Sequence, residues 1–337
     1  MNLRQIELDA IAHKNGPVPA DAIVLENTSE MAAYLGVRED RVYELLGICG
    51  RLIEPQWKPV LRGEKPRGMN AFGTFENDQH AGRENPLDGC ETIEAIEALN
   101  WPDPYDFNFE MMRPMIDSYH GEVAMRGPGW RPLFFKIADL WGMEEALVNM
   151  LSEPELFEVA VERVFEFSYR HAERYMETVG DSVDVFYCCD DFATQRGLMF
   201  SPEQWRKWFK PYYAKLFAIG KKYNRPVWFH SCGDITPVLP DMIEIGMDVW
   251  ETVQLHALPF GMEKLKSEYG RDLCFFGGIS TQKLPFMTPN EVHEITARTI
   301  DVMAKDGGYI CGGDHHIQKE VPPENVLALF ETVREFQ

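Results

Sequence analysis

The pair His230-x-Cys232 is the part of this sequence best suited to chemistry, because histidine and cysteine are both strong metal ligands. In an extended segment, side chains two residues apart point in the same direction, so an imidazole and a thiolate can reach one ion. Cys311 follows much later, at the end of another predicted strand. Two sulfurs and one nitrogen favour zinc with one open position. The sequence therefore predicts a zinc site at His230, Cys232 and Cys311; the alternative is that all three are buried residues without a chemical role.

Further titratable side chains accompany the predicted strands at the same ends. Asp190 and Asp191 follow a strand predicted at 183–189, and Glu251 lies on a strand predicted at 248–253. Each is a candidate catalytic residue, as a proton donor or as a fourth metal ligand. Adjacent acids at a strand end are also common helix caps, so a structural role stays open for them. Four more polar residues are candidate substrate contacts: Gln195, Gln254, His315 and His316.

Strands and helices alternate from about residue 130 onward. Apolar runs rich in β-branched and aromatic residues predict strands at 183–189, 226–229, 248–253, 273–276 and 309–311. Helices between them begin at two capping boxes, Ser201 to Gln204 and Thr288 to Glu291. With room for three more strands upstream, this order predicts a (β/α)8 TIM barrel, in which reactive groups lie at the carboxyl ends of the strands. An open doubly wound sheet is the alternative, but neither GxGxxG nor GxxxxGK[ST] occurs.

The first third of the chain is harder to interpret. Residues 1–70 are predicted to form a helical extension packed on the barrel, and residues 71–337 the barrel itself. Residues 71–130 are irregular and rich in Gly, Asn and Pro, and the only strands predicted there are at 71–75 and 122–125.

Composition excludes several function classes. The 337 residues carry 33 Lys and Arg against 54 Asp and Glu, a net charge of −21. A surface this acidic repels phosphate backbones and anionic lipids, so we expect neither nucleic-acid nor membrane binding. We expect no transmembrane helix and no secretion signal, because no apolar run is long enough. Seven cysteines, an odd number at low density, favour a reducing cytoplasm.

Four segments resemble the uroporphyrinogen decarboxylase superfamily, most closely its zinc-dependent corrinoid methyltransferase branch. These segments are 183–202 (VDVFYCCDDFATQRGLMFSP), 226–246 (PVWFHSCGDITPVLPDMIEIG), 275–282 (FFGGISTQ) and 307–327 (GGYICGGDHHIQKEVPPENVL). The resemblance covers residues 130–337 well and residues 1–130 loosely, and it implies a (β/α)8 barrel. In that branch, a His-x-Cys pair and a distant cysteine hold zinc, and these positions match His230, Cys232 and Cys311.

The resemblance implies methyl transfer between a corrinoid (cobalamin) and a small methylated substrate: a methoxylated aromatic, as in an O-demethylase, a methylamine or a thiol. A corrinoid-binding domain usually shows Asp-x-His-x-x-Gly. The nearest strings, Asp78 to Gly82 and Asp314-His315-His316, do not fit it, so we expect the corrinoid on a separate partner protein.

Two alternatives stay open. One is a metal-free decarboxylase. The arginine-rich signature RQAGRY of true uroporphyrinogen decarboxylases is missing, however, and a substrate with eight carboxylates needs cationic clamps, which a chain at −21 supplies poorly. The other is a binding protein without catalytic activity.

Overall fold

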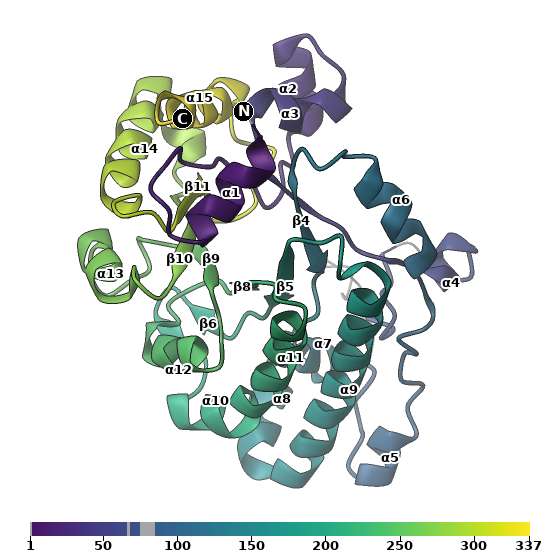
Figure 1. The fold of residues 1–337 in the computed structure, drawn as a ribbon. Coiled ribbons are helices and arrows are strands. Elements are labelled where there is room, and N and C mark those ends of the chain that lie inside the picture. Colours follow the sequence, from purple (N-terminus) through teal and green to yellow (C-terminus); the bar gives the residue numbers. More distant parts are fainter. Residues whose placement is uncertain (1, 66–67, 75–84) are drawn as a thin grey trace.

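The computed structural model describes residues 2–65, 68–74 and 85–337, which form a curled parallel sheet surrounded by helices (Figure 1). The strand order is β1-β4-β5-β8-β9-β10-β11, and every neighbouring pair in this sheet is parallel. The strands are β1 (Gly50–Leu52), β4 (Ala124–Pro128), β5 (Val185–Cys189), β8 (Val227–His230), β9 (Val249–Val253), β10 (Cys274–Ile279) and β11 (Tyr309–Gly313). The prediction of a (β/α)8 barrel is confirmed.

An extended segment at Ala20 closes the circle between the first and last strands. Ala20 forms parallel bridges with Ile48, just before β1, and with Cys311 of β11. The backbone N–H of Asp21 donates to the Cys311 carbonyl at 2.9 Å, and that of Cys49 donates to the Ala20 carbonyl at 2.9 Å. We expected residues 1–70 only to pack on the barrel. They also belong to it, because they supply this segment and β1.

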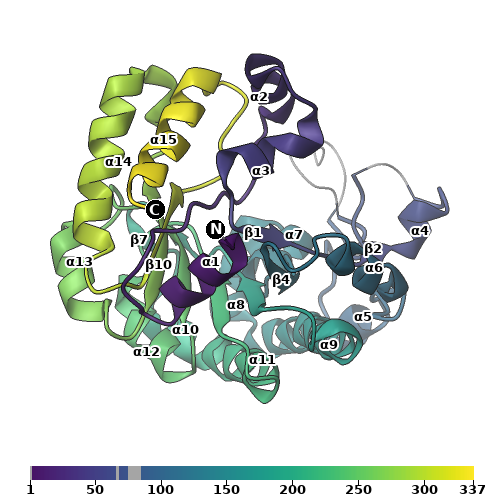
Figure 2. The ribbon, with the colours of Figure 1, turned by 45° about the horizontal axis from the view of Figure 1, so that its top comes forward.

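Helix α1 (Leu3–Ile11) covers the amino ends of the strands. Arg4 pairs with Asp184, just before β5, at 2.6 Å, and its backbone N–H donates to the Glu122 carbonyl just before β4. Ala10 and Ile11 pack on the cluster of side chains inside the barrel. Figure 2 shows α1 lying across this end, so the opposite, carboxyl ends of the strands remain available for a functional site.

The remaining helices surround the sheet. They are α2 (Thr28–Leu35), α3 (Val42–Leu46), α4 (Lys58–Leu61), α5 (Ile93–Glu97), α6 (Met112–Asp117), α7 (Phe134–Trp141), α8 (Met143–Ser152), α9 (Pro154–Val179), α10 (Pro202–Trp208), α11 (Lys210–Lys222), α12 (Leu239–Glu244), α13 (Met262–Tyr269), α14 (Pro289–Met303) and α15 (Pro323–Glu335), with short 3-10 turns at Glu39–Arg41, Phe109–Met111, Thr236–Val238 and Leu284–Phe286. Two antiparallel pairs join β2 (Gln56–Trp57) to β3 (Phe107–Asn108) and β6 (Ala193–Thr194) to β7 (Gly197–Leu198). None of the helices in the described part of the chain combines the length and apolar character needed to cross a bilayer.

Some of the helix starts and strands predicted from the sequence agree with the structure, and others differ from it. The capping box at Thr288 and Glu291 is present, whereas Gln204 accepts a hydrogen bond from the Trp208 indole instead of completing the box at Ser201. The strand predicted at 122–125 is β4, shifted by a few residues. No strand forms within the described residues 71–74, and residue 75 lies outside the described part.

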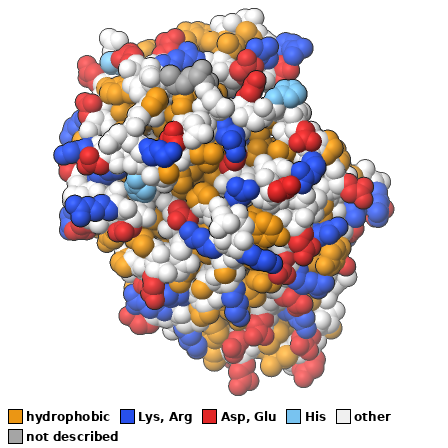
Figure 3. Space-filling view, viewed as in Figure 1, with side chains coloured by type: hydrophobic (Ala, Val, Ile, Leu, Met, Phe, Trp, Pro, Cys, Tyr) orange, Lys and Arg blue, Asp and Glu red, His pale blue; other side chains and the backbone are white. Residues whose placement is uncertain are grey.

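On the face in Figure 3, acidic and basic side chains are interspersed, with hydrophobic side chains between them. This face carries charge of both signs, although the chain as a whole has a net charge of −21.

Asp190 joins the end of β5 to the beginning of α7. Its carboxylate accepts hydrogen bonds from the backbone N–H groups of Leu133, Phe134 and Phe135 at 3.2, 2.7 and 2.9 Å, and from the Tyr213 hydroxyl. Burial raises the pKa of Asp190 to about 6, and these hydrogen bonds oppose the shift. In the structure Asp190 therefore caps α7, and the catalytic role that the sequence suggests for it stays a prediction.

Replacing Asp190 with Ala should lower the free energy of unfolding by about 2–4 kcal/mol, because buried donors lose their acceptor. Urea denaturation measures this change. Asp190→Asn should lose less, and Asp301→Ala, at an exposed position of α14, should stay within about 0.5 kcal/mol of the parent. An equal loss in the Asp190 and Asp301 variants would contradict the capping role.

Candidate metal centre

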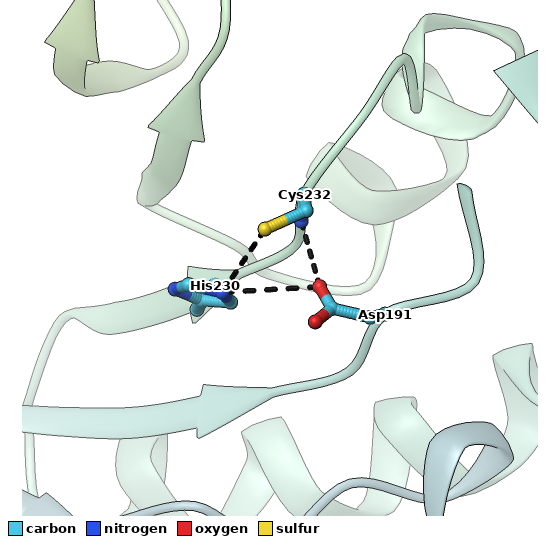
Figure 4. Close-up of side chains that lie close together, drawn as sticks. All are labelled: Asp191, His230 and Cys232. Carbon is cyan, nitrogen blue, oxygen red and sulfur yellow. Dashed lines mark hydrogen bonds and ion pairs between the residues drawn. The ribbon is translucent and has the colours of Figure 1, made fainter. Parts of the chain in front are cut away.

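Asp191, His230 and Cys232 meet at the carboxyl ends of β5 and β8 (Figure 4). The His230 Nε2 atom lies 3.6 Å from the Cys232 Sγ atom and 3.8 Å from the Asp191 Oδ1 atom. The backbone N–H of Cys232 donates to the same Asp191 oxygen at 2.8 Å. One ligand atom from each residue lies within 4.8 Å of the other two, so the three side chains are close enough to share an ion.

The donor set fits zinc. Bonds of about 2.0–2.3 Å in a tetrahedral site place neighbouring ligand atoms about 3.3–3.8 Å apart. The two distances from the His230 nitrogen agree with this spacing. Nitrogen, sulfur and oxygen are all common zinc donors, and three protein ligands leave a fourth position for water or substrate. The arrangement is therefore typical of a catalytic rather than a structural zinc site.

Glu251 of β9 holds the His230 ring through Nδ1, the ring nitrogen that faces away from Cys232. Its Oε1 atom lies 2.7 Å from His230 Nδ1 and accepts a hydrogen bond from the Tyr187 hydroxyl at 3.1 Å. The Trp228 indole N–H donates to the other oxygen, and Arg126 lies 3.9 Å from that oxygen. Burial favours the neutral acid, but His230, Arg126 and Trp228 together hold the pKa of Glu251 below its usual value. A carboxylate on Nδ1 directs the Nε2 lone pair toward the metal position.

Cys311 does not join this group, which corrects the ligand set predicted from the sequence. Successive side chains on a strand point to opposite faces of the sheet. Ile310 packs with Trp228 inside the barrel, whereas Cys311 belongs to the cluster that includes Leu329 of α15. Burial raises the pKa of the Cys311 thiol to about 12. Cys311 is thus a buried core residue in this structure, and Asp191 is the third side chain that lies beside His230 and Cys232.

The four predicted substrate contacts lie in different places. The Gln254 side-chain oxygen accepts a hydrogen bond from the Gly233 N–H at 2.9 Å and so supports the loop after Cys232. Gln195 is exposed at the turn between β6 and β7, and the carbonyl of the neighbouring Thr194 accepts a hydrogen bond at 3.0 Å from the Asp234 N–H, two residues after Cys232. His315 and His316 follow β11, half-buried, with ring centroids 4.8 Å apart. Burial lowers the pKa of His315, as do His316 and His230.

Trp130 is the main site residue that the sequence analysis missed. Its ring lies 5.1 Å from that of His230, edge to face, and its backbone N–H donates to Glu54 at 2.7 Å. Gly129 permits this turn: its φ is +105°, and a Cβ atom there would lie 1.8 Å from the Glu54 Oε1 atom. The segment Gly127-Pro-Gly-Trp130 at the end of β4 was the available signal, in a region that otherwise looks irregular.

Cys232→Ala should remove stoichiometric zinc from the protein, whereas the matched variant Cys311→Ala should retain it, because only Cys232 faces the metal position. Zinc content after dialysis, together with competition against a chelating dye, measures the difference. Loss of zinc in Cys311→Ala with retention in Cys232→Ala would restore the ligand set predicted from the sequence and overturn the geometry described above.

Glu251→Gln should weaken zinc binding about 10- to 100-fold, because an amide supports the His230 imidazole less well than a carboxylate does. Glu294→Gln, on the exposed side of α14, is the control and should bind zinc like the parent. The same dye competition measures both variants, with circular dichroism to verify folding. Equal zinc affinity in the two variants would show that Glu251 does not support the site.

Known proteins resemble this chain in sequence over most of its length and in fold over all of it. The family model for uroporphyrinogen decarboxylase (URO-D) matches residues 84–336. The uroporphyrinogen decarboxylases of Geobacter metallireducens and Geobacter sulfurreducens are each 22% identical over 251 residues, or 72% of this chain and 70% of the relative. A methyltransferase from Methanosarcina mazei superposes with a TM-score of 0.67 at 20% identity, over 100% of this chain and 99% of that one. Since the family model covers well over half of the sequence and the fold agrees, this chain belongs to the uroporphyrinogen decarboxylase family.

Proposed function

We propose that this protein is a zinc-dependent methyltransferase that moves a methyl group between a small methylated substrate and a corrinoid. The observation that carries the proposal is the group of Asp191, His230 and Cys232 at the barrel mouth, backed by Glu251. The shared fold with the Methanosarcina mazei methyltransferase over the whole chain supports it.

The residues of the site have separate tasks in this proposal. His230, Cys232 and Asp191 would hold a zinc ion, and the nearest atoms they offer are Nε2, Sγ and Oδ1. A zinc ion bound there supplies a Lewis acid, which stabilises the leaving oxygen of a methyl ether or lowers the pKa of a thiol substrate. The Thr252 hydroxyl donates to the Cys232 sulfur at 3.7 Å and so helps to orient it. Trp130 covers one side of the His230 ring and excludes water there.

The corrinoid is proposed to arrive on a separate partner protein. Of the two strings nearest to a corrinoid motif, Asp78 to Gly82 lies outside the described residues. In the other, Asp314 is buried, and its Oδ1 atom accepts hydrogen bonds from the backbone N–H and the hydroxyl of Thr281. The substrate candidates are a methoxylated aromatic, a methylamine or a thiol. All seven cysteines are unpaired, which favours the cytoplasm as the proposed location.

A metal-free decarboxylase is the second candidate, and the names of the two Geobacter relatives favour it. Decarboxylation of a porphyrinogen gives no role to a soft donor pair such as Cys232 and His230. Metal dependence therefore separates the two functions.

Zinc-loaded protein mixed with reduced cobalamin and a panel of methyl donors should demethylate at least one donor, as measured by mass spectrometry and the cobalamin absorption spectrum. Cys232→Ala should lower the rate at least 100-fold, because the ion loses a ligand, while Cys311→Ala should stay within about threefold. Conversion of uroporphyrinogen to coproporphyrinogen at equal rates with and without zinc would instead establish the decarboxylase.

A further inference from the structure

A cavity of about 700 Å³ lies beside the candidate metal centre, and aromatic rings form much of its wall. The rings are those of Trp57, Phe72, Phe107, Trp130 and Phe167. Phe167 packs edge to face on Phe72 with centroids 4.8 Å apart, and lies 5.9 Å from Phe107. This volume is in the usual range for small-molecule sites and is much larger than a methylamine or a short thiol requires. Flat aromatic walls favour a flat aromatic ligand.

The cavity and the candidate metal centre share one neighbouring side chain. Trp130 lines the cavity and also lies against the His230 ring, with centroids 5.1 Å apart. Arg131, the next lining residue, donates its backbone N–H to the sulfur of Cys189 at the end of β5. The cavity therefore lies next to the mouth of the barrel, with Trp130 between its wall and the His230 ring.

Two cations belong to the lining, and each has a carboxylate partner. Arg131 lies 3.6 Å from Glu54, which also lines the cavity, and Lys136 pairs with Asp139 at 2.6 Å. The two cations lie over Phe107 and Phe72, at 5.5 Å from each ring centroid. Because cations already cover these two rings, an ammonium ligand is disfavoured there relative to a neutral or anionic one.

One buried hydroxyl is available to orient a ligand. Ser168 of α9 lines the cavity and is 2% exposed. A serine hydroxyl can donate to an acceptor oxygen, so at this wall it can orient an oxygen-bearing occupant. His171, one turn further along α9, is already engaged by Arg131 at 3.3 Å.

We propose that this cavity binds a planar aromatic methyl ether that is neutral or carries a carboxylate, with its methoxy group toward the metal centre. The inference rests on the proposed methyl transfer for the fate of the methyl group. Binding in the cavity depends only on the aromatic rings, the two cations and Ser168. It selects the methoxylated aromatic over the methylamine and the thiol among the substrate candidates.

Calorimetric titration of the full-length, zinc-loaded protein with 4-methoxybenzoate, tetramethylammonium and ethanethiol tests the proposal. We expect measurable binding of 4-methoxybenzoate and none of tetramethylammonium. Trp57→Leu should weaken 4-methoxybenzoate binding at least tenfold, and Ser168→Ala and Lys136→Met at least threefold.

Matched controls lie outside the cavity. Lys207→Met removes a cation that also lies over a ring, that of Trp208 at 3.9 Å, and Phe286→Leu changes a ring that is 89% exposed. Both should bind within twofold of the parent, and circular dichroism verifies that every variant is folded. Binding of tetramethylammonium as tight as that of 4-methoxybenzoate, or unchanged binding in all three cavity variants, would overturn the inference.

The outcome is separable from that of the proposed function. If 4-methoxybenzoate binds as expected but no donor loses its methyl group, the proposed ligand class is supported and the proposed methyl transfer is wrong. If a thiol or methylamine is turned over while 4-methoxybenzoate does not bind, the proposed methyl transfer is supported and the proposed ligand class is wrong.

Discussion

The hydrogen bond between Glu251 and His230 is the interaction on which the site depends. A carboxylate inside a barrel pays a large desolvation cost unless its oxygens are paired, and here three neighbouring strands supply the partners. Tyr187 comes from β5, Trp228 and His230 from β8, and Arg126 from β4. The imidazole is thereby held in one orientation before any ion or substrate arrives.

The support of Glu251 extends across the barrel to the first residues of the chain. Arg126 pairs with Asp21, in the segment that closes the barrel, and lies 4.3 Å from the Trp228 ring centroid. Gly50 leaves the space for this pair, since a Cβ atom there would lie 1.8 Å from the Arg126 Nη2 atom. Glu7 lies next to them, and burial and the nearby Asp21 raise its pKa well above the usual value even though Arg126 opposes the shift. The closure of the barrel and the geometry of the candidate metal centre therefore depend on the same buried charges.

Two adjacent acids illustrate how position divides roles. Asp190 is fully buried and accepts hydrogen bonds from the first turn of α7, while the Asp191 side chain is 21% exposed and faces His230 and Cys232. Their side chains point in opposite directions. Asp190 contacts the surrounding helix α7, and Asp191 lies at the mouth of the barrel. Trp130 then joins the mouth to the aromatic cavity, so that ion and ligand can be held by neighbouring groups.

The sequence by itself determined the barrel and the pair His230 and Cys232. Alternating strands and helices follow from local patterns of apolar residues, and a separation of two residues on an extended segment fixes a common direction. It could not determine which third side chain lies beside this pair, because in Tyr309 to Gly313 nothing local tells which residues face inward. The pairing with β10 and with Ala20 decides that Cys311 points to the helices. The choice between Asp190 and Asp191, the placing of Trp130 and the role of Glu251 likewise depend on contacts between segments far apart in sequence, which only the folded chain brings together.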